Sequence, residues 1–159
     1  MSPPIRLPVP SRRARAAVVL VTGLLLGATG QAQTADGRSG TLKTVQGDVS
    51  LLRGDTVAMA RPGDGVGVRD RLVTGGDGAA ALTLRDGSQL LVGPRSSVAL
   101  SRFEYEATTQ QGHLAVDLLR GSLRFITGLI ARQDPSQVRV TTPTAVVGVR
   151  GTDFIVEAP

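Results

Sequence analysis

The chain has no cysteine and no tryptophan, and only one histidine, one tyrosine and three phenylalanines in 159 residues. The lack of cysteine excludes disulfide bonds and a lipid anchor on a cysteine. With a single histidine besides, the chain has too few ligands for a zinc, copper or haem site. The scarcity of aromatic side chains argues against stacking surfaces for nucleic acid bases or sugars. We therefore expect no cofactor and a core built mainly from aliphatic side chains.

The net positive charge is also small outside the N-terminus. The formal net charge is +5, but four of the 18 basic residues, Arg6, Arg12, Arg13 and Arg15, precede residue 16. The remaining 14 basic residues are nearly balanced by 13 acidic residues, and they do not cluster along the sequence. Because nucleic-acid-binding surfaces need clustered positive charge, we expect no nucleic-acid partner.

The N-terminal segment has the pattern of a secretory signal peptide. Residues 1–15 form a positively charged n-region, residues 16–28 an apolar h-region of 13 residues, and Gly30-Gln31-Ala32 offers small residues before a cleavage site. An apolar run of this length is shorter than the ~20 residues that span a bilayer. The pattern predicts a signal helix within residues 1–32, cleavage after Ala32, and a periplasmic or secreted protein. The alternative is an uncleaved anchor, through which alone we expect the chain to touch a membrane.

Short β-prone runs separated by Gly, Asp and Pro fill the rest of the chain, and no helical period persists. Residues 33–40 are small and polar and are expected to be a flexible lead-in to a β domain over residues 41–159. The polar residues 104–113 are expected to form an exposed loop, and residues 128–136 either a loop or a single helical turn. The expected strands are 42–45, 48–52, 56–60, 71–74, 79–84, 89–92, 97–103, 114–119, 122–127, 137–142, 145–149 and 152–156.

Two all-β architectures fit this pattern. Segments starting at Gly47, Gly87 and Gly121 share one form, in which a short β run lies between two glycines. Such a repeat is consistent with the stacked layers of a β-solenoid. Short strands between glycine turns are also typical of a two-sheet sandwich, and Asp86-Gly87 suits a tight hairpin turn. We therefore expect an all-β domain, either solenoid-like or a two-sheet sandwich.

No set of residues predicts an enzyme or a metal site. His113 and Asp117 share one face of an expected strand, but no nucleophile motif accompanies them. Carboxylates that a glycoside hydrolase would need are present at Glu104, Glu106, Asp117 and Asp153, without the aromatic side chains that sugar clefts usually carry. Acidic residues near glycines, Asp64, Asp70 and Asp77, lack the spacing of a calcium loop and are expected to be turn residues.

Five phrases, in order along the chain, resemble the FecR domain of bacterial envelope proteins. They are GDVSLLRG (47–54), DRLVTG (70–75), LRDGSQLLVGP (84–94), LLRGSL (118–123) and the most specific, TPTAVVGVRGTDF (142–154). Arg69 stands where the family often has a glycine. The resemblance implies a FecR-like β domain. It also implies structural roles for residues within the phrases: Asp86, Gly87, Gly121, Pro143, Arg150, Gly151, Thr152 and Phe154.

The resemblance further implies a non-catalytic periplasmic binding or sensing module. In the best-known members such a domain contacts a TonB-dependent transporter and relays its occupancy to a sigma factor through a membrane helix. We expect the partner to be an envelope protein, such as a TonB-dependent transporter or another outer-membrane protein, or peptidoglycan. Few residues precede the apolar segment or follow Phe154, so relay to a sigma factor by this chain alone is not expected.

Partner binding is expected at a sheet edge or at the polar loop, with Glu104, Tyr105, Glu106 and Arg150 as the contact residues. The alternative function is a structural envelope component that self-associates through β edges. Neither reading specifies an oligomeric state.

Overall fold

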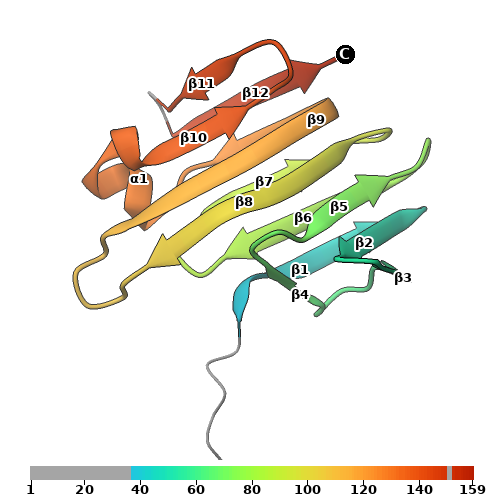
Figure 1. Ribbon diagram of the computed structural model, residues 1–159, viewed down its shortest axis with the longest axis horizontal. Coiled ribbons are helices and arrows are strands. Elements are labelled where there is room, and N and C mark those ends of the chain that lie inside the picture. The colour runs from blue at the N-terminus through green and yellow to red at the C-terminus, as the bar shows by residue number, and fades with distance from the viewer. Residues whose placement is uncertain (1–36, 150–151) are drawn as a thin grey trace, which may run out of the picture. The chain divides into compact units, whose positions relative to one another are not determined.

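The computed structural model describes residues 37–149 and 152–159, which fold mostly as β-strands (Figure 1). A short helix, α1 (Leu129–Gln133), and a 3-10 turn (Pro135–Gln137) follow β9. The all-β class is thus confirmed, whereas the signal helix predicted for residues 1–32 lies outside the described residues. The strands are β1 (Arg38–Gln46), β2 (Val49–Arg53), β3 (Thr56–Met59), β4 (Gly65–Gly67), β5 (Arg71–Thr74), β6 (Ala79–Leu84), β7 (Gln89–Val92), β8 (Ser97–Tyr105), β9 (Gly112–Ile126), β10 (Val138–Thr141), β11 (Val146–Gly148) and β12 (Asp153–Ala158).

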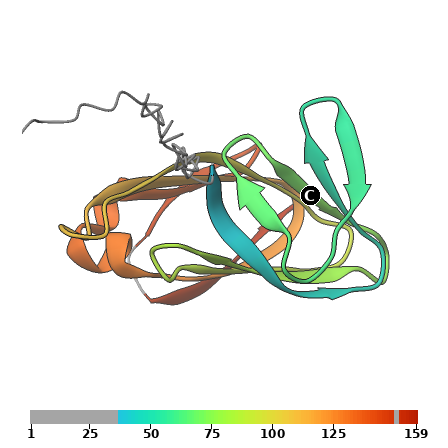
Figure 2. The ribbon, with the colours of Figure 1, turned by 90° about the horizontal axis from the view of Figure 1, so that it is seen from below.

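The strands form one sheet that curls until its two halves face each other. Its order is β3-β2-β5-β8-β9-β7-β6-β1-β4; outside this path, β10 and β12 pair with β9, and β11 pairs with β10. Figure 2 shows the two layers, with β8 in one and β6 and β7 in the other. Among the described strands, only β9 and β10 pair in parallel. The coils of a solenoid stack their strands in parallel. The antiparallel pairing of the other strands therefore corresponds to the two-layer alternative, built here from a single curled sheet.

Strand β9 belongs to both layers. Its first half pairs with β8 and β10, and its second half, from Gly121, pairs with β7 and β12. Gly121 has a φ of +85°, which L-residues rarely adopt, and an added Cβ would overlap the Ser96 hydroxyl. The two strands expected at 114–119 and 122–127 are therefore one strand, which crosses between layers at this glycine.

The core between the layers is aliphatic, as the composition predicts. Buried positions alternate with half-buried ones along β6, because successive side chains of a strand point to opposite faces. The two layers contribute Leu82 and Leu90 from one side and Leu100 and Leu118 from the other. One aromatic pair adds to this core within a single layer: the buried Phe125 ring of β9 stacks on Phe154, its cross-strand neighbour on β12, with centroids 5.3 Å apart. Burial of these side chains is the main source of the stability of the domain.

The expected strand bounds are confirmed for β5, β6 and β7. Strand β4 was not expected, because two of its three residues are glycines, and β1 begins at Arg38, inside the expected lead-in. The expected loop at 104–113 is wrong at both ends: β8 runs to Tyr105 and β9 begins at Gly112, which leaves a turn of residues 106–111. Polar side chains do not prevent strand pairing there, because one face of the extended hairpin is exposed to water.

Candidate functional site

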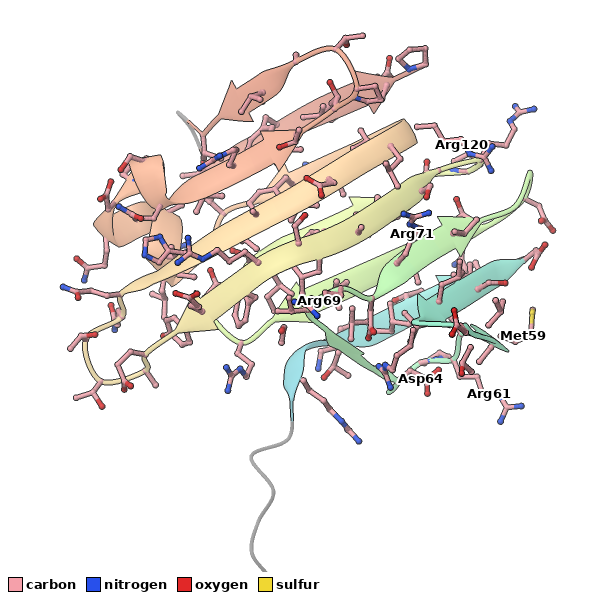
Figure 3. All side chains as sticks on the ribbon, viewed as in Figure 1. Met59, Arg61, Asp64, Arg69, Arg71 and Arg120 are labelled. Carbon is pink, nitrogen blue, oxygen red and sulfur yellow. The ribbon has the colours of Figure 1, made fainter. Side chains whose placement is uncertain are left out.

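An open groove of about 640 Å³ lies between the β2–β3 hairpin and β4, which are the two ends of the curled sheet. Within the described part of the chain, β3 and β4 each have a strand neighbour on one side only. Figure 3 shows Met59, Arg61 and Asp64 gathered at this end of the molecule. We call this groove the edge groove; its apolar lining comes from Leu51, Ala58 and Val68, and its polar lining includes Arg53, Asp64 and Asp70.

An ion pair between β2 and the residue before β5 fixes one wall of the edge groove. The Arg53 guanidinium binds the buried Asp70 carboxylate through two nitrogens, with Nη2 2.6 Å from Oδ2 and Nε 3.0 Å from Oδ1. Nη2 also donates to the Gly65 carbonyl at 2.9 Å, and the Gly67 N–H donates to Asp70 at 2.8 Å. The hydrogen bond to Asp70 raises the pKa of Arg53 above its ordinary value. The exposed remainder of the guanidinium keeps donors that suit a peptide carbonyl or a carboxylate.

The Asp86-Gly87 turn between β6 and β7 is tied to the start of α1. The Asp86 side chain is 0% exposed, and its Oδ2 accepts a hydrogen bond of 2.7 Å from the Ser88 hydroxyl. That hydroxyl in turn accepts the Gly128 N–H at 2.9 Å, and the Leu129 N–H donates to the Asp86 carbonyl at 2.8 Å. Gly87 has a φ of +82°. The side chains of Asp86 and Ser88 are therefore engaged inside the fold rather than presented to a partner.

A second buried network joins the end of the same phrase, 84–94, to two further phrases, 70–75 and 118–123, at the bend of β9. The Thr74 hydroxyl donates to the Gly93 carbonyl at 2.6 Å and accepts the Ser96 N–H at 2.9 Å. The Ser96 hydroxyl accepts the Ser122 N–H at 2.9 Å, directly beside Gly121. Phrases that lie far apart in the sequence thus meet here, and their small polar residues hold the bend in place.

The C-terminal phrase follows β10 directly and includes β11 and the start of β12. Pro143 lies at the exposed corner between β10 and β11, where the Ala145 N–H donates to the Thr142 hydroxyl at 3.0 Å. The Thr152 carbonyl accepts the Thr127 N–H at 2.9 Å, and Phe154 packs on the core. Arg150 and Gly151 lie outside the described residues, so their predicted roles stay predictions.

The predicted contact residues at 104–106 are partly engaged within the fold. Glu104 is paired with Arg102 at 3.0 Å, a hydrogen bond that lowers the pKa of Glu104. Tyr105 is half-buried, with its ring 6.5 Å from that of Phe103. Glu106 accepts the Thr108 N–H at 3.1 Å, and this bond lowers its pKa. The part of this region that is open to a partner is therefore the turn that follows β8, rather than the whole segment Glu104-Tyr105-Glu106.

The residues considered for catalysis form no hydrogen-bonded set within the described part of the chain. No hydrogen bond joins His113 to Asp117 in the described structure; the Ser101 hydroxyl donates to Asp117, and Glu104 lies opposite His113 in the ladder. Asp153 forms an ion pair of 2.5 Å with Arg124. Among residues 37–149 and 152–159, no group of three or more His, Asp or Glu side chains has the geometry to hold a metal ion.

Several residues that build the site were not singled out from the sequence. Arg53, Ser88, Ser96 and Gly128 act through partners 17 to 40 residues away in the chain. Their one common sequence signal is a small or polar residue beside a glycine turn, which is too frequent in this chain to be selective.

Comparison with protein families matches residues 70–159 to the family described as FecR protein, which is more than half of the chain. The chain belongs to the FecR family. A search of curated proteins and a search of solved structures each found no match. The family match begins at Asp70 of the edge groove and includes both buried networks and strands β10 to β12.

FecR proteins are a regulatory or sensing family associated with the bacterial envelope. In this FecR protein, none of the helices in the described residues has the length and hydropathy needed to cross a membrane. Strands β1 to β4 precede the matched residues, so most of the edge groove is built from sequence outside the family match.

Proposed function

We propose that this chain is a non-catalytic sensing module of the bacterial envelope, which is exported to the periplasm and acts by binding an envelope protein. The FecR match over residues 70–159 is the observation that carries the proposal. The signal-peptide pattern of residues 1–32 supports export. The two buried networks support recognition without catalysis, because they use the polar side chains of the family phrases for internal hydrogen bonds.

The edge groove is the surface proposed to receive the partner. It combines an apolar lining from Leu51, Ala58 and Val68 with the exposed donors of Arg53 and the carboxylate of Asp64. An extended peptide in such a groove gains main-chain hydrogen bonds along a strand edge and side-chain contacts at alternate positions. A segment from an envelope protein, such as a TonB-dependent transporter, fits this chemistry better than a glycan strand, because the described residues that line the groove include no aromatic side chain.

Crosslinking in living cells, followed by affinity capture, tests the proposal. The chain should enrich one envelope protein, and Val68→Lys should abolish the enrichment by placing a charge in the groove. Leu119→Lys is the matched control, because Leu119 is 38% exposed and Val68 39%. Glu106→Lys tests the polar turn as the alternative contact. If only Glu106→Lys abolishes capture, the partner binds at the turn of residues 106–111 instead of the groove. Fractionation of the chain with the cytosol would overturn the proposal.

A further inference from the structure

Strand β3 has an exposed edge that lacks the usual protection against pairing. It is the terminal strand of the sheet and pairs only with β2 among the described strands. Val57 and Met59 point to one face and are 66% and 60% exposed. The four residues of β3 include no charge, proline or bulge, which are the features that natural edge strands use to prevent association. Figure 2 shows the β2–β3 hairpin projecting at one end of the domain.

The free backbone groups of this edge belong to Val57 and Met59. In the ladder with β2, Leu51 lies opposite Ala58, and the Ala60 N–H donates to the Val49 carbonyl at 2.8 Å. Antiparallel ladders alternate, so the even-numbered residues of β3 direct their N–H and C=O groups toward β2. The N–H and C=O groups of Val57 and Met59 consequently point away from it, toward the open side.

We propose that a second copy of this chain pairs with β3 in antiparallel orientation, about a two-fold axis that passes beside Ala58. Residues equally distant from Ala58 then face each other across the interface. Val57 lies opposite the partner's Met59, and Met59 opposite the partner's Val57. Both pairs are of the hydrogen-bonded kind, so all the free backbone groups of Val57 and Met59 find partners, and the exposed apolar side chains cover each other.

Charge complementarity selects this register and this occupant. Asp55 and Arg61 are each three residues from Ala58, so Asp55 lies opposite the partner's Arg61 at both ends of the paired strands. Both residues are exposed, and no ion pair within the described residues involves either side chain. A shift of the register that centres the axis on Val57 places Asp55 opposite Met59 and loses both ion pairs. The sequence around β3 is therefore complementary to itself in one register.

A two-fold interface of this kind uses the β3 edge of both copies and closes at the dimer. It differs from the open self-association that the sheet edges suggested at the sequence level, because no β3 edge remains for a third copy. The contact involves one short strand, so the dimer is expected to be weak and dependent on concentration. The dimer does not rest on the proposed function, because it is measured on the purified chain alone. The two surfaces are adjacent, since Ala58 of β3 also lines the edge groove.

Disulfide trapping tests the register directly, because the chain has no cysteine of its own. In a non-hydrogen-bonded antiparallel pair the two Cα atoms are about 4.5 Å apart, within the roughly 4.4–6.8 Å that a disulfide spans. Ala58→Cys in the chain purified as the cell processes it should therefore give a covalent dimer under mild oxidation. Ile155→Cys is the control, because Ile155 is 66% exposed on another edge strand, and it should stay monomeric.

Charge exchange with sedimentation equilibrium gives an independent reading. Asp55→Arg or Arg61→Asp alone should weaken dimerisation roughly tenfold, because two cross-strand attractions become repulsions. The double exchange should restore the affinity of the native chain. The inference is overturned if the native chain stays monomeric up to about 1 mM, if Ala58→Cys fails to crosslink while a dimer is present, or if the double exchange does not rescue the single ones. All three measurements use the purified chain without a partner, so a negative result overturns the dimer and leaves capture of an envelope protein to the crosslinking experiment.

Discussion

At the scale of single residues, backbone strain is found at Arg69. It has a φ of +73°, in the left-handed region that favours glycine, and its N–H donates to the Leu100 carbonyl at 2.7 Å. The conformation is imposed by its neighbours, because Asp70 must turn inward to meet Arg53. The glycine that FecR phrases often carry at this position has a physical reason, and the arginine here retains the turn at a conformational cost.

Arg69→Gly should raise the free energy of unfolding. Removal of the Cβ relieves about 1–2 kcal/mol of left-handed strain. Glycine also raises the conformational entropy of the unfolded chain, which offsets part of this gain, so a net increase of about 0.5–1 kcal/mol is expected. Urea denaturation measures the difference. Arg69→Ala is the control, since it removes the same exposed side chain and keeps the Cβ; equal stability of the two variants would show that the position is not strained.

At the scale of elements, β9 organises the domain. It pairs with β8, β10, β7 and β12, and it passes from one layer to the other at Gly121. The Thr74 and Ser96 hydroxyls hold the bend from the neighbouring turns. An element that pairs with four others transmits a local distortion to both layers, so the bend is the most sensitive point of the fold.

Gly121→Ala should destabilise the domain by about 2–4 kcal/mol, because the alanine must keep the positive φ of this position and its Cβ overlaps Ser96. Urea denaturation followed by circular dichroism measures the loss. Gly148→Ala is the matched control, since a Cβ at that β11 glycine meets no atom of the described residues within 4 Å, and its effect should stay within about 0.5 kcal/mol. Similar losses for the two variants would contradict the role assigned to the bend.

At the scale of the whole molecule, exposed carboxylates make stability depend on pH on the acid side. The hydrogen bond from Arg124 lowers the pKa of Asp153, that from Ser136 lowers the pKa of Asp134, and that from Arg102 lowers the pKa of Glu104. A carboxyl whose pKa is lower in the folded state stabilises the fold above its unfolded pKa. That contribution is lost as pH falls through the folded pKa.

The midpoint of urea unfolding should therefore change little between about pH 5 and 7 and fall below about pH 4, where carboxyl groups of the unfolded chain titrate. The fall of the urea midpoint with decreasing pH should be smaller at high salt, because these groups are exposed and salt screens their attraction to arginine. Asp153→Asn should flatten the curve in acid. A midpoint that stays constant down to pH 3 would contradict the assignment.

The sequence on its own determined the class of fold and the places where the chain turns. The bounds of β5, β6 and β7 follow from apolar alternation between Gly and Asp turns, and the FecR phrases indicate the family. These are local signals, because side chains of a strand alternate with a period of two whatever its neighbours are. The continuous strand through Gly121 and the short β4 were not predicted. Glycine usually marks the end of a strand, and the sequence alone does not show which neighbouring strands would pair with it.

Only the tertiary structure decided which segments meet. The curl of the sheet brings β2 and β3 to β4, and so creates the edge groove and the Arg53–Asp70 pair across 17 residues of chain. The exposed edge of β3 is likewise a consequence of strand order, which no local pattern encodes. Strand pairing is non-local and is selected by the burial of the whole core, so surfaces formed where distant strands end exist only once the chain has folded.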